Sequence, residues 1–428
     1  MASESNVRLV RQLSFGLFLL AALCLLRVPL AAAMHACLDC HKNLKEEPLR
    51  RPAIKIADDY HVARGLKCEK CHGGDHTALD NKEQGHSKAK GFVGKPRRQD
   101  IPAFCGKCHS DPRYMRRFNP SIRTDQVKEY YTSVHGKKLR EGDKKVAVCI
   151  SCHDVHAIRA IKDQAAWTYP IKVSETCTRC HADAKYMQDY KIPTDQLKNY
   201  KQSIHYEALA KKGDISAPTC PSCHGNHGAT PPGVDSVANV CSHCHAATAE
   251  LFDKSVHKEA FSDLGQPACV TCHGNHEVVK PSDELLAAGK DTPCATCHEA
   301  DSPEIKKANE LRTLLVDLSS RIEQADAILN RAEYAGMEVG PPKFELIEAK
   351  DSLIRARAET HVLKVKRIKA LTDPGVAVAQ KTIKKGQELM VEFHFRRKWL
   401  AASLLVIAAV LVGLFFKIKE VDRRQGPG

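Results

Sequence analysis

Aromatic side chains are scarce in this chain of 428 residues, where Phe, Trp and Tyr together make up 6% and Trp occurs only twice. Cysteine, with 19 residues, stays below the about 8–10% that is typical of small disulfide scaffolds. No RNP, zinc-finger or helix-turn-helix signature accompanies the excess of Lys and Arg. A disulfide-stapled scaffold and a nucleic-acid-binding protein are therefore disfavoured, and the shortage of aromatic residues calls for another source of core volume.

The cysteines that are present follow one pattern. All except Cys24 occur in pairs with two residues between them, and a histidine directly follows each pair. At these frequencies chance would give about 0.04 copies of C-x-x-C-H, whereas the chain has nine, and this motif is typical of c-type haem attachment. The paired residues are Cys37, Cys40, Cys68, Cys71, Cys105, Cys108, Cys149, Cys152, Cys177, Cys180, Cys220, Cys223, Cys241, Cys244, Cys269, Cys272, Cys294 and Cys297.

Two cysteines at this spacing share a turn of backbone, where both thiols form thioethers to the haem vinyl groups and the next histidine is held beneath the iron. We therefore predict nine covalent haems c, whose macrocycles supply the missing core volume. Their propionates would bring up to about 18 negative charges and offset the formal net charge of +14. The predicted proximal ligands are His41, His72, His109, His153, His181, His224, His245, His273 and His298.

The motifs belong to a longer repeat with a period of 70 to 72 residues. C-G-K-C-H-S-D-P-R-Y-M at Cys105 matches C-T-R-C-H-A-D-A-K-Y-M at Cys177, and T-D-Q-V-K-E-Y-Y-T-S-V-H ending at His135 matches T-D-Q-L-K-N-Y-K-Q-S-I-H ending at His205. Each copy has a first motif, an S-x-H element, and a second motif with another histidine three residues after its own. Four copies, two of them degenerate or shortened, and the lone motif at Cys294 account for all nine motifs.

The repeat also predicts the distal iron ligands, because the same extra histidines recur in it. Either His76 or His86 is expected as the eighth, and His361, His35 or the unused member of that pair as the ninth. Bis-histidine ligation of every haem would give low-spin, low-potential irons without an open coordination site. Seven distal ligands follow from repeated positions: His61, His135, His156, His205, His227, His257 and His276.

Two apolar segments lie outside the motif region. Residues 1–33 have basic residues, an apolar run and an A-x-A ending, which predicts a secretory signal peptide or, if it is not cleaved, an N-terminal anchor. Residues 399–416 form an uncharged stretch that would make about 27 Å of helix between basic flanks, and we predict a transmembrane helix there. Because haem attachment takes place outside the cytoplasm, residues 417–428 are predicted to be a cytoplasmic tail.

Residues 302–395 lack cysteine and have helical periodicity. Ser302 and Pro303 are a suitable helix start, and apolar residues then recur at steps of three and four. After a G-P-P break, Ile347, Ile354, His361 and Ile368 recur every seven residues until Pro374. We predict a mainly α chain, with an irregular haem-packed domain over 35–300, an antiparallel helical hairpin, a shorter helix and a C-terminal membrane span. The apolar steps of the first helix are Leu311, Leu315, Leu318, Ile322, Ala325, Leu329 and Ala332.

Over residues 37–298 the doubled C-x-x-C-H motifs with S-x-H and C-H-G-x-H elements resemble the multihaem c-type cytochromes of respiratory chains. The membrane anchor is similar to that of the tetrahaem quinol-dehydrogenase family, although those proteins carry it at the N-terminus. The hairpin is similar to the dimer-forming helices of the pentahaem nitrite reductases, which leaves a homodimer open. The C-x-x-C-K motif of that family is absent, so its activity is not carried over.

These features favour an electron carrier in the bacterial inner membrane, with its haem domain in the periplasm. It would take electrons from a quinol-oxidising membrane subunit and pass them to periplasmic cytochromes or a terminal reductase. The competing hypothesis is a multihaem oxyanion reductase with one five-coordinate haem, for which the lone motif ending at His298 is the candidate. A haem-based sensor is disfavoured, because the few residues after Lys419 are too short for an output domain.

Overall fold

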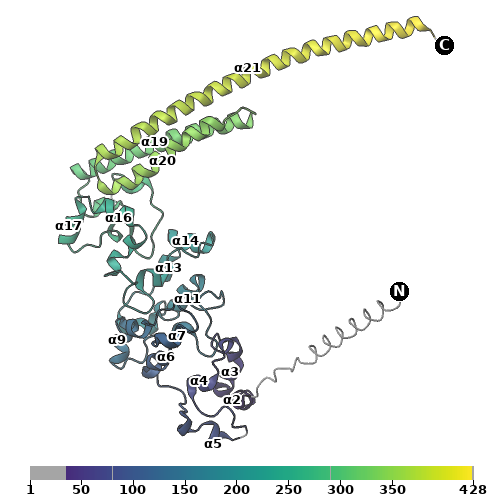
Figure 1. Cartoon of the computed structure of the whole chain (residues 1–428). Coiled ribbons are helices and arrows are strands. Elements are labelled where there is room, and N and C mark those ends of the chain that lie inside the picture. The colour runs from purple at the N-terminus through teal and green to yellow at the C-terminus, as the bar shows by residue number, and fades with distance from the viewer. Residues whose placement is uncertain (1–34, 80, 290, 427–428) are drawn as a thin grey trace, which may run out of the picture. The chain divides into compact units, whose positions relative to one another are not determined.

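A computed structural model describes residues 35–79, 81–289 and 291–426 (Figure 1). These residues form helices and irregular segments, and none of them is in a strand. The chain divides into two compact units: unit 1 contains residues 1–195 and 212–232, and unit 2 contains residues 196–211 and 233–428. The division therefore falls within the motif-bearing region and not at its end near residue 300. The predicted signal segment and Cys24 lie outside the described residues.

Unit 1 consists of short helices, and each described motif in it ends a helix at its own histidine. This follows from the motif, since two cysteines three positions apart face the same side when they occupy one helical turn. The motif helices are α2 (Ala36–His41), α4 (Cys68–His72), α6 (Ile101–His109), α10 (Cys149–His153), α11 (Pro170–His181) and α15 (Cys220–His224). The other elements are α3 (Glu47–Lys55), η1 (Ile56–Asp58), η2 (Val62–Arg64), α5 (Lys82–Gly85), η3 (Lys88–Lys90), η4 (Arg98–Asp100), α7 (Pro112–Met115), α8 (Gln126–Tyr130), α9 (Val134–Arg140), α12 (Ala184–Met187) and η5 (Gln188–Tyr190).

The repeat is visible in the helix starts as well as in the motifs. Asp111 accepts hydrogen bonds from the backbone N–H groups of Arg113 and Tyr114 in α7, and one period later Asp183 accepts one from Tyr186 in α12. Ser133 accepts a hydrogen bond from the backbone N–H of Gly136 at the start of α9. The apolar core of unit 1 is small for so many residues, which fits a domain that needs additional apolar volume. Its fully packed members are Ile101, Tyr130, Leu139, Val146 and Val148.

Unit 2 combines short motif-bearing helices with a bundle of three long ones. The short elements are α13 (Gln196–Tyr200), α14 (Ile204–Lys211), η6 (Val237–His243), α16 (Ala246–Phe252), α17 (His257–Asp263), α18 (Val270–His273), η7 (Asp283–Leu286), η8 (Pro293–Thr296) and η9 (Thr360–Val362). The long ones are α19 (Pro303–Tyr334), α20 (Gly340–Glu359) and α21 (Val365–Gln425). Ser302 caps α19 through the backbone N–H of Ile305, as its position before Pro303 predicts.

The seven apolar residues predicted along α19 are all buried in the bundle, but α20 packs through a different face from the predicted one. Ile347 and Ile354 have exposed fractions of 49% and 64% and point away from the core. The buried face is formed instead by two leucines and two alanines, Leu346, Ala349, Leu353 and Ala356. The heptad prediction for this helix was therefore wrong in register.

The sequence predicted a hairpin, a shorter helix and a membrane span, and the structure joins the last two in one helix. This helix, α21, packs along both α19 and α20 and continues well beyond them (Figure 1). Pro374, expected to end a helix, lies inside α21. The following Gly375 sits against Leu318 of α19, where a Cβ atom would come within 3.1 Å of that side chain. Close packing in the bundle thus holds the helix through a residue that would otherwise break it.

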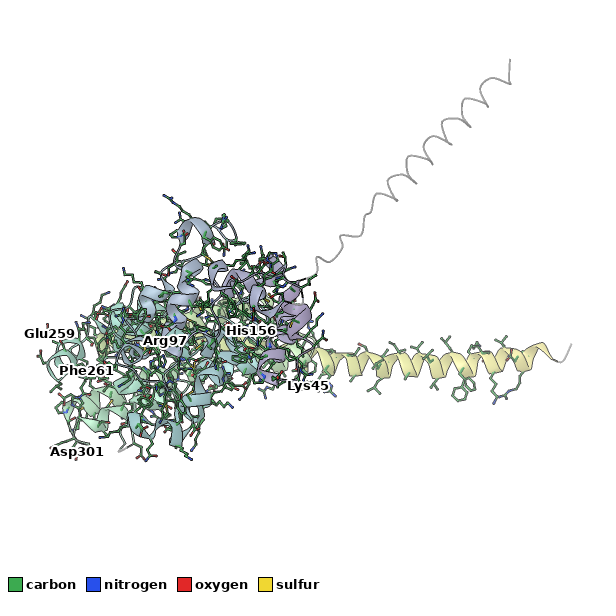
Figure 2. The ribbon with its side chains drawn as sticks, turned by 90° about the horizontal axis from the view of Figure 1, so that it is seen from below. Lys45, Arg97, His156, Glu259, Phe261 and Asp301 are labelled. Atoms are coloured by element: carbon green, nitrogen blue, oxygen red, sulfur yellow. The ribbon has the colours of Figure 1, made fainter. Side chains whose placement is uncertain are left out.

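The last part of α21 makes it long and apolar enough to cross a bilayer. The helix has 61 residues, which correspond to a length of about 92 Å. Its apolar stretch from Trp399 to Phe416 is exposed along its whole length, and its side chains stand clear of the ribbon in Figure 2. An unburied apolar helix of this length has the property expected of a membrane anchor.

Candidate metal centres

Histidine rings lie in pairs along the described chain, and eight of these pairs join one C-x-x-C-H histidine to one histidine from elsewhere. In unit 1 the pairs and their ring-centroid distances are His41–His86 6.1 Å, His61–His109 6.0 Å, His72–His156 6.1 Å, His135–His181 6.0 Å and His153–His227 6.1 Å. In unit 2 they are His205–His245 6.5 Å, His257–His298 6.1 Å and His273–His361 6.1 Å.

The narrow range of these distances fits two imidazoles on opposite sides of one iron. An imidazole nitrogen binds a metal ion at about 2.0 Å, so two such rings have centroids about 6 Å apart. Two imidazoles that hydrogen-bond each other directly would lie closer, at about 5 Å. Together with the adjacent cysteine pairs, the donor set therefore fits haem c with two axial histidines.

Several of these rings are oriented by a hydrogen bond from Nδ1, which leaves Nε2 for a metal. In the pair His41–His86 both rings are fixed in this way, by the backbone carbonyls of Leu49 at 3.1 Å and Lys82 at 2.8 Å. The Nδ1 atom of His72 lies 3.2 Å from the carbonyl oxygen of Val93. The two groups that bind one iron would thus be held by backbone that belongs to different elements.

The ring of His61 differs, because its Nδ1 atom lies 2.9 Å from Oδ1 of Asp59, a carboxylate. Asp59 has an exposed fraction of 5% and also accepts a hydrogen bond from the backbone N–H of Ile158 at 2.8 Å. Burial acts to raise the pKa of Asp59, but the hydrogen bonds from His61 and Ile158 outweigh it and the pKa is lowered. The carboxylate is therefore ionised at neutral pH. The sequence-based search missed this residue.

Burial also acts on the histidines themselves, because it disfavours the charged imidazolium. It lowers the pKa of His153 to about 4, with a smaller contribution from His227. The pKa values of His109, His135 and His181 are lowered for the same main reason. These rings are thus neutral near pH 7, which is the form that binds metals.

The pairs follow a rule that links successive copies of the repeat. The histidine of an S-x-H element faces the first motif of the next copy, as in His135–His181 and His205–His245. The histidine that trails a second motif faces the second motif of the preceding copy, as in His153–His227. A copy therefore places histidines against the motifs of a neighbouring copy.

The structure also separates the candidates that the sequence left open. His86 faces His41, and His361 at the junction of α20 and α21 faces His273. His76 lies instead beside His35, with ring centroids 5.4 Å apart, which is shorter than in any of the eight pairs above. His35 is buried, and its Nε2 atom is 2.9 Å from a carboxylate oxygen of Glu69.

Two other predicted ligands lie in different units. His224 belongs to unit 1 and His276 to unit 2. In the repeat, His224 has the place of His153, and His276 has the place of His227.

The motif thiols are half-buried or exposed and form no disulfide among the described residues. Within one copy the first cysteines of the two motifs are in contact, as in the hydrogen-bonded pairs Cys105–Cys149 and Cys241–Cys269. This hydrogen bond and burial raise the pKa of Cys105. Between copies the second cysteines lie near each other instead, as Cys152 does to Cys180. Within each unit, consecutive motifs are thus neighbours in space.

Within the described ranges, no three His, Cys, Asp or Glu side chains converge to form a site of the kind that holds a bare metal ion. Haem iron needs only two protein ligands, which is the number that the pairs offer. Comparison with protein-family models, with curated proteins and with solved structures finds no match to this chain.

Proposed function

We propose that this chain is a membrane-anchored c-type cytochrome that carries electrons through nine covalently bound haems. The observation that carries the proposal is the set of eight histidine pairs with ring centroids 6.0 to 6.5 Å apart, each next to a C-x-x-C-H motif. The motif cysteines would hold each haem by thioethers, the motif histidine would be the proximal ligand, and the facing histidine the distal one.

Bis-histidine ligation favours electron transfer over catalysis. A haem held in this way takes up and gives up single electrons at its iron and has no free position for a substrate. The lone motif that ends at His298 was the candidate for an open site in the reductase hypothesis. His298 faces His257 at the same spacing as the other pairs, so this observation supports the carrier.

The arrangement of the motifs supports transfer along the chain within each unit. Within each unit the first cysteines of a copy meet and the second cysteines of successive copies approach each other, so consecutive motifs of one unit lie side by side. Examples are Cys105–Cys149 within a copy and Cys71 near Cys108 between copies in unit 1, and Cys272 near Cys297 in unit 2. Covalent attachment to adjoining segments would keep the macrocycles close and fixed.

Ion pairs connect η7, which lies between the last two motifs, to the helices of the bundle. The apolar stretch belongs to α21 of the same bundle. Arg357 of α20 makes a bidentate ion pair with Asp283 of η7, with N–O distances of 2.9 and 2.8 Å. Arg312 of α19 holds Glu284 in the same way. Since His361 from the bundle faces His273, one haem would take one axial ligand from the motif region and the other from the bundle.

This connection supports entry of electrons at the membrane end of unit 2. With the haem region in the periplasm and α21 crossing the inner membrane, the donor would be a quinol-oxidising membrane subunit. Acceptors would be periplasmic cytochromes or a terminal reductase.

The test is to count the haems and determine their spin state in the full-length protein. The mass of the denatured, reduced protein should exceed that of the processed polypeptide by nine haems, and low-temperature electron paramagnetic resonance should show low-spin iron only. Eight or fewer haems would contradict the motif assignment. A high-spin signal from one iron in the unmodified protein would contradict the carrier and favour the reductase.

A further inference from the structure

We propose that Asp59 is a positioning residue that lowers the reduction potential of the haem attached at Cys105 and Cys108, by hydrogen-bonding the distal ligand His61. This inference rests on the proposed function, because it concerns one haem of the predicted nine. It distinguishes that haem from the three others that occupy the same place in the repeat.

Asp59 differs from the residues that occupy the same place in the other copies. Two positions before the distal histidine, the later copies have Ser133, Ser203 and Ser255, whereas the first copy has Asp59. Ser133 donates to the backbone carbonyl of Tyr130 at 2.6 Å and accepts from a backbone N–H of its own helix. Ser203 makes the same two kinds of contact. Within the part of the chain that the structure describes, no hydrogen bond reaches the ring of the histidine in these three copies.

Asp59 uses its carboxylate differently. Oδ1 accepts from both the backbone N–H and the ring Nδ1 of His61, each at 2.9 Å, and Oδ2 accepts from the backbone N–H of Ile158 at 2.8 Å. The side chain is nearly enclosed, with 5% of it exposed, and its only ion-pair partner among the described residues is His61. Among the described residues no Lys or Arg side chain pairs with this charge, and burial shields it from solvent.

The direction of the effect follows from the charge. A carboxylate that accepts the Nδ1 proton of a ligating imidazole makes the ring more basic and more electron-rich at Nε2. Such a ligand stabilises ferric over ferrous iron and lowers the potential, and burial keeps the effect from being screened. The three copies with serine lack this contact, so the haem attached at Cys105 and Cys108, which His61 faces, should have the lowest potential among the four equivalent haems.

Asp59 also holds the neighbouring site in place. The segment that carries Ile158 begins just after His156, the residue that faces His72, and the backbone N–H of Tyr60 donates to the carbonyl of Ile158 at 2.7 Å. Removal of the carboxylate could therefore act through position alone. The experiment must therefore distinguish the loss of the Asp59 charge from the displacement of His61 as a ligand.

The experiment uses the full-length holoprotein with Asp59→Asn and Asp59→Ser, followed by potentiometric titration with spectroscopic detection. We expect nine covalent haems, all low-spin, and an upward shift in the midpoint potential of one of them. The shifted component should be the one that His61→Ala converts to high-spin. Asp58→Asn is the matched control, since Asp58 is exposed, pairs with Arg159 and does not touch His61. It should leave every potential unchanged.

Each other outcome overturns the inference. A high-spin iron in Asp59→Asn would mean that the residue only holds His61 in place, and an unchanged or lowered potential would mean that its charge does not reach the iron. An equal shift in Asp58→Asn would point to general surface charge. A parent protein without covalent haem would refute the proposed function itself, which is a different result from low-spin haems whose potentials do not respond.

Discussion

Replacing His361 by Ala should convert one of the nine haems to high-spin iron while leaving all nine attached. His361 lies in η9 between α20 and α21, far in sequence from every motif, and its ring centroid is 6.1 Å from that of His273. Its Nδ1 atom is fixed by the carbonyl of Ala358 at 2.9 Å, which leaves Nε2 for the iron. Without this ring, the haem held by His273 would lose its distal ligand.

The structural cost of this change is small. The side chain is half-buried, and losing its one hydrogen bond costs about 1 kcal/mol, so the bundle should remain folded. Attachment depends on the distant Cys269 and Cys272, so the haem count should not change. The high-spin signal should account for about one-ninth of the iron by low-temperature electron paramagnetic resonance, in proportion to the nine predicted sites.

A matched control comes from the same stalk. His394 lies exposed on α21, and His394→Ala should leave all irons low-spin. His35→Ala should also open no haem, because the ring nitrogen of His35 is bonded to Glu69. A fully low-spin spectrum from His361→Ala, or high-spin iron from either control, would refute the assignment of the stalk histidine as a ligand.

Three further predictions concern the anchor, the bundle and acid stability. Cutting the chain before Arg396 should release a protein that keeps its haems, accepts electrons from a chemical reductant and appears in the periplasmic fraction; retention in the membrane after cell fractionation would point to a second anchor or a tight membrane partner. Leu318→Ala should lower the free energy of unfolding by about 2–5 kcal/mol, since Leu318 is fully buried, whereas the exposed Ile354→Ala should change it by less than about 0.5 kcal/mol, both followed by denaturant titration of the helical signal. The hydrogen bond that Tyr190 donates to Asp143 at 2.7 Å lowers the pKa of this carboxyl group. The carboxylate therefore stabilises the fold above its unfolded pKa of about 3.9, and this stabilisation is lost as the pH falls through the folded pKa. Asp143→Asn should have a lower melting temperature than the parent at pH 7, and the difference should vanish in acid.

The sequence was informative where the chemistry is local. Two cysteines and a histidine within five residues define an attachment motif regardless of what surrounds them, so the proximal candidates needed no tertiary information. The start of α19 at Ser302 and its buried apolar face could be predicted for the same reason, since a cap and a periodicity are both properties of one segment. Such signals do not depend on a partner elsewhere in the chain.

Prediction failed where a partner decides the outcome. Ile354 fits a heptad by type, yet α20 turns the neighbouring residue Leu353 into the core and leaves Ile354 exposed. A proline alone would break a helix at Pro374, but α21 is packed against both α19 and α20. For Pro374, packing in the bundle outweighs the cost of about 3 kcal/mol that a proline imposes inside a helix.

The sequence also could not predict which two histidines face each other. Repeated spacing indicated which histidines are candidate ligands, but not which iron each would serve, because the partner belongs to another copy. His61 faces His109 and not a motif of its own copy, and His257 faces His298, which the sequence analysis had placed outside the repeat. With this rule the lone motif is the first motif of a fifth, truncated copy. Its second motif is missing, and His361 of the stalk faces His273, the position that a trailing histidine would otherwise serve.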